Sequence, residues 1–257
     1  VINSLSGAGQ MMFTKYLVVV SGEVDIRDYR KLFDHIWRNT DLCSDLLFTS
    51  GPLDVLDHSS ETFALGAKLG IDASEKLSDE KSLPLIARPA DITGEKDPLL
   101  IQILQMAGEG NNVYRPNDLP IAIAGLDTEK DKGIVSRIRM TLKKDESDSF
   151  PGLIIIVDHT VDIRDLFEVS WQVLSNTDPK RDIDIVNGRI LIVDGTIKAF
   201  REGGFPRRWP NVVCSSEETI EKVDKKWDSL GLGPFILSPS LKSSGLNRTG
   251  NEHIITG

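Results

Sequence analysis

The chain reads VVVSGEVDIRDYRKLFDHIWRNTD at residues 18–41 and IIVDHTVDIRDLFEVSWQVLSNTD at residues 155–178. Between Val24–Asp41 and Val161–Asp178 the offset is constant at 161 − 24 = 137, and eight of the eighteen aligned residues are identical. This is too many for chance. A period of 137 residues far exceeds the roughly 20–50 residues of a solenoid repeat. The sequence therefore predicts a duplicated domain or half-domain.

Each copy has the pattern of a strand followed by a helix. The apolar runs Leu17–Val20 and Leu153–Val157 are typical of strands buried in a parallel α/β sheet. The shared word VDIRD then predicts a helix start, with Asp25 and Asp162 as N-caps and a further aspartate in each first turn. We expect an α/β fold of strand–helix units with a mainly parallel or mixed sheet.

The predicted helices carry matching apolar stripes and end at Asn39 and Asn176, where a C-terminal cap is expected. Because every shared residue has a role in folding, the first explanation of the repeat is structural. The stripes consist of Tyr29, Leu32, Phe33, Ile36 and Trp37 in the first copy and Leu166, Val169, Val173 and Leu174 in the second.

The rest of the chain is predicted to form three parts: a first α/β domain at 1–92, a second, divergent copy at 93–232, and a tail at 233–257 that is extended or disordered. Further predicted elements are a linker at Ser82–Glu95, helices at Asp97–Met106, Gly133–Lys144 and Glu217–Leu230 (with a serine N-cap and Gly231 past its end), and a strand at Leu119–Ala124.

Bulk properties exclude several classes of protein. The chain has 257 residues, a net charge of −9 and a pI of about 5.0, which argues against nucleic acid and anionic membranes as main partners. No apolar run approaches the roughly 18 residues of a transmembrane segment. Two cysteines without a CxxC word favour free thiols and a cytoplasmic protein. The start at Val1, without a signal peptide or an initiator Met, leads us to expect a fragment of a longer protein.

General catalytic motifs are absent from the sequence, including HExxH, GxSxG, the P-loop and GxGxxG. The four histidines are far apart and show no metal-ligand spacing; they are His35, His58, His159 and His253. One basic residue stands out, because Lys15 directly precedes an apolar strand. Its ammonium could extend to solvent, or it could lie at a phosphate near the sheet edge.

Two long words carry a resemblance to a known family. QMMFTKYLVVV at residues 10–20 and LDHSSETFALGAKLGIDASEK at residues 56–76 resemble the C-terminal domain of the UbiD family, which includes 3-octaprenyl-4-hydroxybenzoate decarboxylase. The second copy is similar to the family at DPKRD, residues 178–182, and at DGTIKAFREGGFPRRWP, residues 194–210. The resemblance implies a duplicated UbiD C-terminal-like domain.

The copies depart from the family in different places. The first has DLCSD at residues 41–45 where the family has a DPxRD word, and the second lacks the LDHSS…GAK loop. The resemblance covers residues 6–77 and 151–230, and the span 85–150 is placed only by its lead into the second copy.

The resemblance implies that the parent protein is a carboxy-lyase that uses prenylated FMN, with Mn²⁺ and K⁺ at the flavin phosphate, in ubiquinone or menaquinone biosynthesis. The family's Glu-Arg-Glu catalytic set lies in upstream flavin-binding and barrel domains, which are the expected partners. No catalytic or metal-binding residue is therefore carried over, and no cofactor is expected on this fragment alone. By its place in the word FTKY, Lys15 corresponds to a ligand of the flavin phosphate. The loop with His58, Thr62 and Phe63 corresponds to a segment near the substrate pocket.

Three functional hypotheses follow. The first is the C-terminal part of a UbiD-type decarboxylase, inactive on its own and expected to form a homo-oligomer. The second is a non-catalytic assembly module, in which the two copies build subunit contacts. The third is a separate small-molecule-binding α/β protein, which explains the repeat but not the start at Val1. Whether the upstream region encodes the Glu-Arg-Glu barrel distinguishes the first hypothesis from the others.

Overall fold

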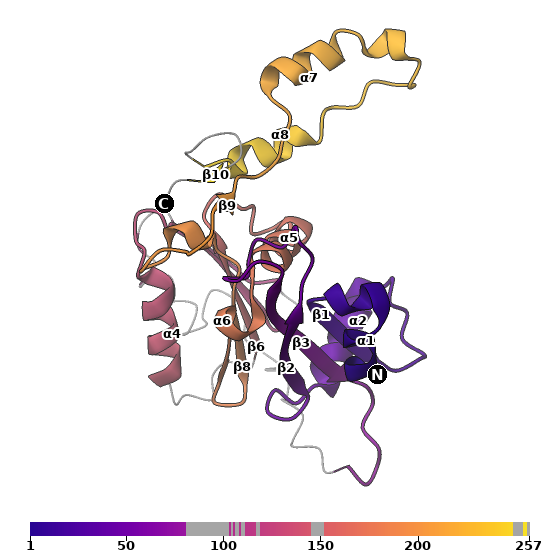
Figure 1. Cartoon of the computed structure of the whole chain (residues 1–257), viewed down its shortest axis with the longest axis vertical. Helices are drawn as coiled ribbons and strands as arrows, with labels where there is room; N and C mark the ends of the chain where they lie inside the picture. Colours follow the sequence, from indigo (N-terminus) through magenta and orange to yellow (C-terminus); the bar gives the residue numbers. More distant parts are fainter. Residues whose placement is uncertain are drawn as a thin grey trace.

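The computed structural model describes residues 1–80, 103, 105, 108, 111–116, 119–144, 152–248 and 254–255. The predicted linker 82–95 and most of the predicted helix 97–106 lie outside these residues. Two sheets form the body of the described chain, one from each copy of the repeat (Figure 1). The fold is thus mixed α/β, as the sequence predicts.

The first copy forms a three-stranded sheet in the order β1-β3-β2. β1 runs parallel to β3, and β2 runs antiparallel to β3. Before β1 lie two short helices, α1 and η1. The bounds are α1 Ile2–Ser6, η1 Gly9–Phe13, β1 Tyr16–Val20, α2 Tyr29–Asn39, β2 Leu46–Pro52 and β3 Leu65–Ala73.

The second copy repeats this arrangement inside a five-stranded sheet of order β4-β5-β6-β8-β7. β6 runs parallel to β8, and β7 runs antiparallel to β8. β5 is parallel to β6 and connects to it through α4, so the predicted β-α-β unit is confirmed. The bounds are β4 Asn112–Tyr114, β5 Ile121–Leu126, α4 Ile134–Lys144, β6 Gly152–Asp158, α5 Leu166–Asn176, α6 Pro179–Asp182, β7 Ile183–Val186 and β8 Ile190–Asp194.

Strand register confirms the duplication. Val19 of β1 pairs with Asp72 of β3, and Ile156 of β6 pairs with Asp194 of β8. Since 19 + 137 = 156, the residues that correspond in sequence hold the same position in the two sheets. The copies differ between their last two strands. Residues 53–64 join β2 to β3, whereas the three residues 187–189 join β7 to β8.

A second repeated feature follows the last strand of each copy. Asp72 accepts hydrogen bonds from Ser74 N (3.1 Å) and Oγ (2.5 Å), as Asp194 does from Thr196 N (3.0 Å) and Oγ1 (2.6 Å). The lysines that follow also correspond. Lys76 pairs with Asp45 at 2.8 Å, and Lys198 lies 3.2 Å from Asp194 and 3.8 Å from Asp182. These ion pairs fix the end of each sheet to the helix exit.

The predicted N-caps were wrong by three residues. The helices begin at Tyr29 and Leu166, and Asp28 and Asp165 cap them by accepting the Lys31, Phe167 and Glu168 amides. Asp25 and Asp162 instead close a preceding turn, where each accepts the amide two residues on at 3.0 Å. The VDIRD word thus contains two consecutive aspartate turns. Its second aspartate stands directly before the helix and is therefore the cap.

The predicted helix stripes are partly confirmed. Val169 is buried and Leu32 is half-buried, but Tyr29, Leu166 and Leu174 are exposed. The main core lies between the five-stranded sheet and α4, and a second cluster lies on the α5 side of the same sheet. The three-stranded sheet of the first copy has less cover, because α2 has no fully buried residue.

The chain after β8 passes through η3 (Lys198–Phe200) and β9 (Trp209–Pro210) to α7 (Glu217–Asp224) and η4 (Trp227–Leu230). The predicted serine N-cap is confirmed as Ser216, and Gly231 follows Leu230 in a left-handed conformation, but the predicted single helix is two short ones. In Figure 1, α7 stands away from both sheets. The bounds of the last elements are α8 Ser240–Ser243, η5 Ser244–Leu246 and β10 Ile254–Ile255.

Part of the segment predicted as a tail packs on the second copy. β10 pairs antiparallel with β9, and Leu246 and Ile255 are buried. Both cysteines, Cys43 and Cys214, are free thiols, as predicted. None of the helices in the described residues is both long and apolar enough to span a membrane.

Candidate functional site

The ammonium of Lys15 lies at the start of β1 and contacts the loop between β2 and β3. Its Nζ donates to Asp57 Oδ2 at 2.8 Å and to Ser59 Oγ at 3.0 Å. Only 11% of the Lys15 side chain and 13% of the Asp57 side chain are exposed. The backbone of Lys15 is fixed too, because its carbonyl accepts the Leu69 amide of β3 at 2.9 Å. The Lys15 ammonium is therefore fixed by hydrogen bonds and does not extend freely to solvent.

Asp57 organises the loop around this ion pair. Its Oδ1 accepts the Ser59 and Ser60 amides at 3.0 and 3.1 Å, and both serines are fully buried. Partial burial raises the pKa of Asp57, but the charge of Lys15 and the hydrogen bonds from Lys15, Ser59 and Ser60 outweigh it. The pKa of Asp57 thus lies below its usual range, and the carboxylate is ionised at neutral pH.

His58 faces the second copy. Its Nε2 lies 3.2 Å from Asn176 Oδ1, and its ring packs edge-on against Trp209 with ring centroids 4.7 Å apart. Burial lowers the pKa of His58, so the neutral ring is favoured at neutral pH, and its Nε2–H tautomer donates to the amide oxygen. In this arrangement His58 joins the two copies.

Thr62 and Phe63 form the exposed end of the loop. Phe63 is 64% exposed, and the guanidinium of Arg207 lies 5.6 Å from its ring centroid. Thr62 is also exposed, and its carbonyl accepts the Ser60 hydroxyl at 2.8 Å. The structure thus brings Lys15 and His58 to the buried base of the loop and leaves Thr62 and Phe63 at its surface.

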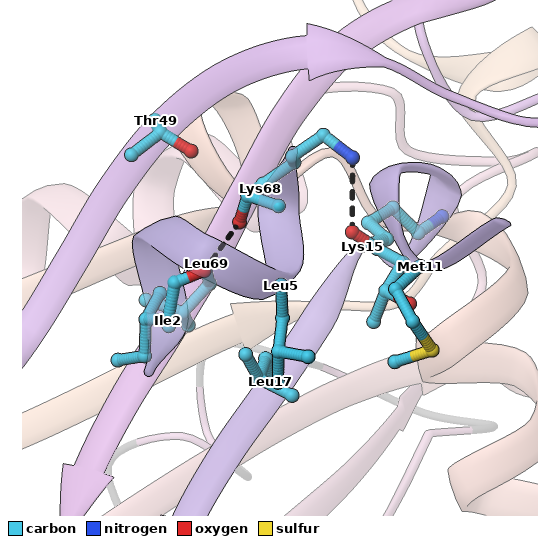
Figure 2. A pocket seen from close by; sticks show the side chains of 11 residues that line it. Ile2, Leu5, Met11, Lys15, Leu17, Thr49, Lys68 and Leu69 are labelled. Carbon is cyan, nitrogen blue, oxygen red and sulfur yellow. Dashed lines mark hydrogen bonds between the residues drawn. The ribbon is translucent and has the colours of Figure 1, made fainter. Parts of the chain in front are cut away.

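A second buried lysine was missed by sequence reasoning. Lys68 of β3 is 4% exposed and lines a narrow cavity beside α1 with Lys15, Met11 and apolar side chains (Figure 2). Its Nζ donates to the carbonyls of Met12 and Thr14, the latter at 3.0 Å. Burial lowers the pKa of Lys68. One signal was visible in the sequence: a lone lysine within the apolar run of β3.

Lys68 also fixes the approach to Lys15. The two carbonyls that it binds belong to the end of η1 and to the residue directly before Lys15. Sequence reasoning also missed the roles of Asp57, the loop residue that binds Lys15, and of Arg181 and Arg207, which contact the loop.

The number of donors on Lys15 limits what else its ammonium can bind. Lysine has three N–H donors, and two of those on Lys15 are used by Asp57 and Ser59. Among the hydrogen bonds described, one N–H of Lys15 therefore has no partner. The residues that the structure describes contain no group of three or more His, Cys, Asp or Glu side chains placed to hold a metal ion.

The family model for the C-terminal domain of 3-octaprenyl-4-hydroxybenzoate carboxy-lyase, the UbiD C-terminal domain, matches residues 1–73 and 121–204. The chain belongs to the UbiD family. The first matched segment contains Lys15 and the loop, and the second contains the repeated unit of β6, α5, β7 and β8.

Two curated relatives show how much of their own length the chain covers. An uncharacterized protein of Helicobacter pylori (strain J99) is 28% identical over 232 residues, which is 88% of this chain and 35% of the relative. An uncharacterized protein of Aquifex aeolicus is 33% identical over 94 residues, which is 31% of this chain and 19% of the relative. The chain therefore spans about a third of the length of the Helicobacter relative.

Two solved structures are similar to parts of the chain, both with low scores. One is an evolved dimeric form of the UbiD-class enzyme HmfF from Pelotomaculum thermopropionicum in complex with prenylated FMN. It has a TM-score of 0.34 and 22% identity and covers 41% of this chain and 26% of its own. The other is the vanillic acid decarboxylase of Sedimentibacter hydroxybenzoicus in an open form, with a TM-score of 0.35 and 16% identity over 72% of this chain and 44% of its own.

Proposed function

We propose that this chain is the C-terminal part of a prenylated-FMN-dependent decarboxylase that acts on an aromatic acid in quinone biosynthesis. The observation that carries the proposal is the match of both copies to the C-terminal domain of a carboxy-lyase. The prenylated FMN bound to the related HmfF enzyme supports the choice of cofactor. Such a protein is expected to act in the cytoplasm.

Prenylated FMN supplies an electron sink for the electron pair left as CO2 departs. In this chain, Lys15 is the residue proposed to contact the flavin phosphate. It would do so with its remaining N–H, while Asp57 and Ser59 keep the ammonium in place. His58, Thr62 and Phe63 are proposed to lie on the side of the substrate pocket. The described residues contain no group of three or more His, Cys, Asp or Glu side chains placed for Mn²⁺, and upstream domains are proposed to bind Mn²⁺ and K⁺.

The catalytic groups of the parent protein are proposed to lie upstream, so this chain alone is expected to be inactive. The test compares the full-length protein with the 257-residue chain, each produced together with a flavin prenyltransferase. Release of CO2 from a panel of aromatic acids by the full-length protein alone would support the proposal. Turnover by the chain itself, or by neither protein despite bound cofactor, would contradict it.

A second candidate role is assembly of a homo-oligomer. The observation that favours it is the apolar surface of the segment after η4, where Phe235, Ile236 and Leu237 are each half or more exposed. In Figure 1 this segment extends from the body together with α7. Exposed apolar residues in such a group are typical of protein–protein contacts.

Light scattering on the chain tests this assembly role. Replacing Phe235 and Ile236 by Asp is expected to turn an oligomer into a folded monomer, whereas Glu218→Lys on the exposed face of α7 is expected to leave the oligomer intact. A wild-type chain that is monomeric at high concentration would remove the role.

A further inference from the structure

The two copies of the repeat differ in complementary ways. The first copy has the long connection of residues 53–64, but at the helix exit it has Ser44. The second copy has only a three-residue turn between its last strands, and at the corresponding position it has Arg181, since 44 + 137 = 181. The copy with the loop therefore lacks the arginine, and the copy with the arginine lacks the loop.

The loop and the arginine meet across the copies. Arg181 Nη1 donates to the Ser59 carbonyl at 2.7 Å. A second arginine, Arg207, donates from its Nη1 to the Ser60 carbonyl at 2.9 Å and to the Asp57 carbonyl at 3.2 Å. All three of these acceptors are main-chain atoms. Arg207 Nη1 also donates to the Ser60 hydroxyl at 3.2 Å. The arginines therefore fix the path of the loop backbone mainly through main-chain acceptors.

Other groups of the second copy complete the contact. The Ser59 hydroxyl lies 2.9 Å from the Thr177 carbonyl, and Asp178 Oδ2 accepts the Ala67 amide at 3.1 Å. Tyr16 of β1 is hydrogen-bonded to the Thr177 hydroxyl. Both the loop and the strand that follows Lys15 are thus anchored on the end of α5.

Arg181 is itself rigidly held. Its Nε and Nη2 donate to the two carboxylate oxygens of Asp182 at 2.8 and 2.6 Å, and Asp182 is 1% exposed. Such a two-point contact fixes the plane of a guanidinium group. Asp182 also accepts the Asp178 amide at 2.7 Å. The direction of the Nη1–H that Arg181 donates to Ser59 is therefore set by Asp182 and not by the loop.

We propose that Arg181 and Arg207 form an arginine clamp: they are positioning residues of the second copy that fix the backbone of Asp57, Ser59 and Ser60 and thereby set the place of the Lys15 ammonium. The clamp gives the second copy a role in the flavin site without any contact to the flavin. The effect of the clamp on flavin binding rests on the proposed function, but the contacts by which the arginines fix the loop do not.

The test uses Arg207→Met as the main variant, because Arg207 has no buried carboxylate that its loss would leave unpaired among the contacts described. Arg181→Met is the second variant, and Lys180→Met is the matched control. Lys180 is an exposed cation of α6, the short helix that also contains Arg181. It donates to Ser50 Oγ of the first copy at 2.8 Å, but it does not contact the loop.

Two measurements on the 257-residue chain report on the clamp. The first is hydrogen exchange at the Ser59 and Ser60 amides, which is expected to be about tenfold faster or more in Arg207→Met, with the amides of β5 and β6 unchanged. The second is the midpoint at which the Asp57 carboxyl titrates, followed by carbon NMR. We expect a rise toward the ordinary aspartate value, because a released loop loses its contact with Lys15.

Wild-type exchange and wild-type titration in Arg207→Met would overturn the clamp, as would equal effects from Lys180→Met. A third measurement separates the clamp from the proposed function. In the full-length protein, Arg207→Met is expected to lower prenylated-FMN occupancy. If the loop is released but occupancy stays at the wild-type level, the clamp stands and the flavin role of Lys15 fails.

Discussion

Removing either charge of the Lys15–Asp57 pair is expected to destabilise the first copy by more than an ordinary surface ion pair would. Lys15 Nζ and Asp57 Oδ2 are 2.8 Å apart. Only 11% of the Lys15 side chain and 13% of the Asp57 side chain are exposed. At an effective dielectric constant of about 20, Coulomb's law gives about 6 kcal/mol for unit charges at this distance. Desolvation of the two groups cancels much of that energy. Hydrogen bonds to charged groups retain a net value of roughly 1.5–3 kcal/mol.

A double-mutant cycle measures this coupling. Urea unfolding at pH 7 of wild type, Lys15→Met, Asp57→Asn and the double variant is expected to give a coupling free energy of about 2 kcal/mol. Lys15→Met is expected to be the more harmful single change, because it leaves the Asp57 carboxylate partly buried without its counter-ion. A coupling energy below about 0.5 kcal/mol would refute the reasoning, since that is the value of an exposed pair.

The same pair predicts a dependence on pH. Because the pKa of Asp57 is depressed in the folded chain, its contribution is fully present above the unfolded pKa of about 3.9. The contribution is lost as the pH falls through the folded pKa. The difference in unfolding free energy between wild type and Asp57→Asn is therefore expected to be constant from pH 7 to about pH 5 and to shrink below that. A difference that grows toward acid would contradict the assigned direction.

Three further predictions concern the repeated elements. Lys198→Met is expected to cost about 3–5 kcal/mol in denaturant unfolding, because it removes the buried cation between Asp182 and Asp194 and leaves them only Arg181 and Arg139 as cationic partners among the described residues. The partly exposed Lys76→Met is expected to cost about 1 kcal/mol, and equal costs would show that Lys198 is not buried. Asp165→Ala is expected to lower the free energy of unfolding by about 1 kcal/mol, because Asp165 is the N-cap of α5, and Asp162→Ala is expected to lower it by less. A larger effect of Asp162→Ala would show that Asp162 is the cap, as the sequence predicts. Val169→Ala is expected to lower the free energy of unfolding by about 2 kcal/mol, and Leu32→Ala by no more than that, because Leu32 is only half-buried. An unchanged denaturant midpoint for Val169→Ala would place that side chain at the surface.

The repeat topology could be predicted from the sequence because its signals are local. The ungapped match fixes the spacing from strand to helix, and both copies keep that spacing as far as the start of β2 and β7. The caps were misplaced for a local reason as well. Asp25 and Asp28 are both able to cap a turn, and only the backbone geometry shows that the helix begins after the second.

The loop contacts could not be predicted in the same way. Ser59 meets Arg181, a residue 181 − 59 = 122 positions away, and no periodic pattern links them. The signal in the sequence was a difference between the copies: the first has Ser44 at the position where the second has Arg181. Sequence reasoning noted the change at the helix exit but had no means of placing the arginine against a loop of the other copy. Lys68 was missed because its partners are main-chain carbonyls, which no side-chain motif reveals.

Occupancy of prenylated FMN in the full-length protein tests the central claim most directly. Wild type, Lys15→Ala and the exposed control Lys180→Ala are purified in parallel, and bound flavin is measured by ultraviolet–visible absorbance beside the melting temperature. If Lys15 holds the flavin phosphate, Lys15→Ala retains about tenfold less cofactor than the other two, as expected for one lost charge-assisted hydrogen bond. Wild-type occupancy in a folded Lys15→Ala protein would contradict the account and leave Lys15 as the structural partner of Asp57.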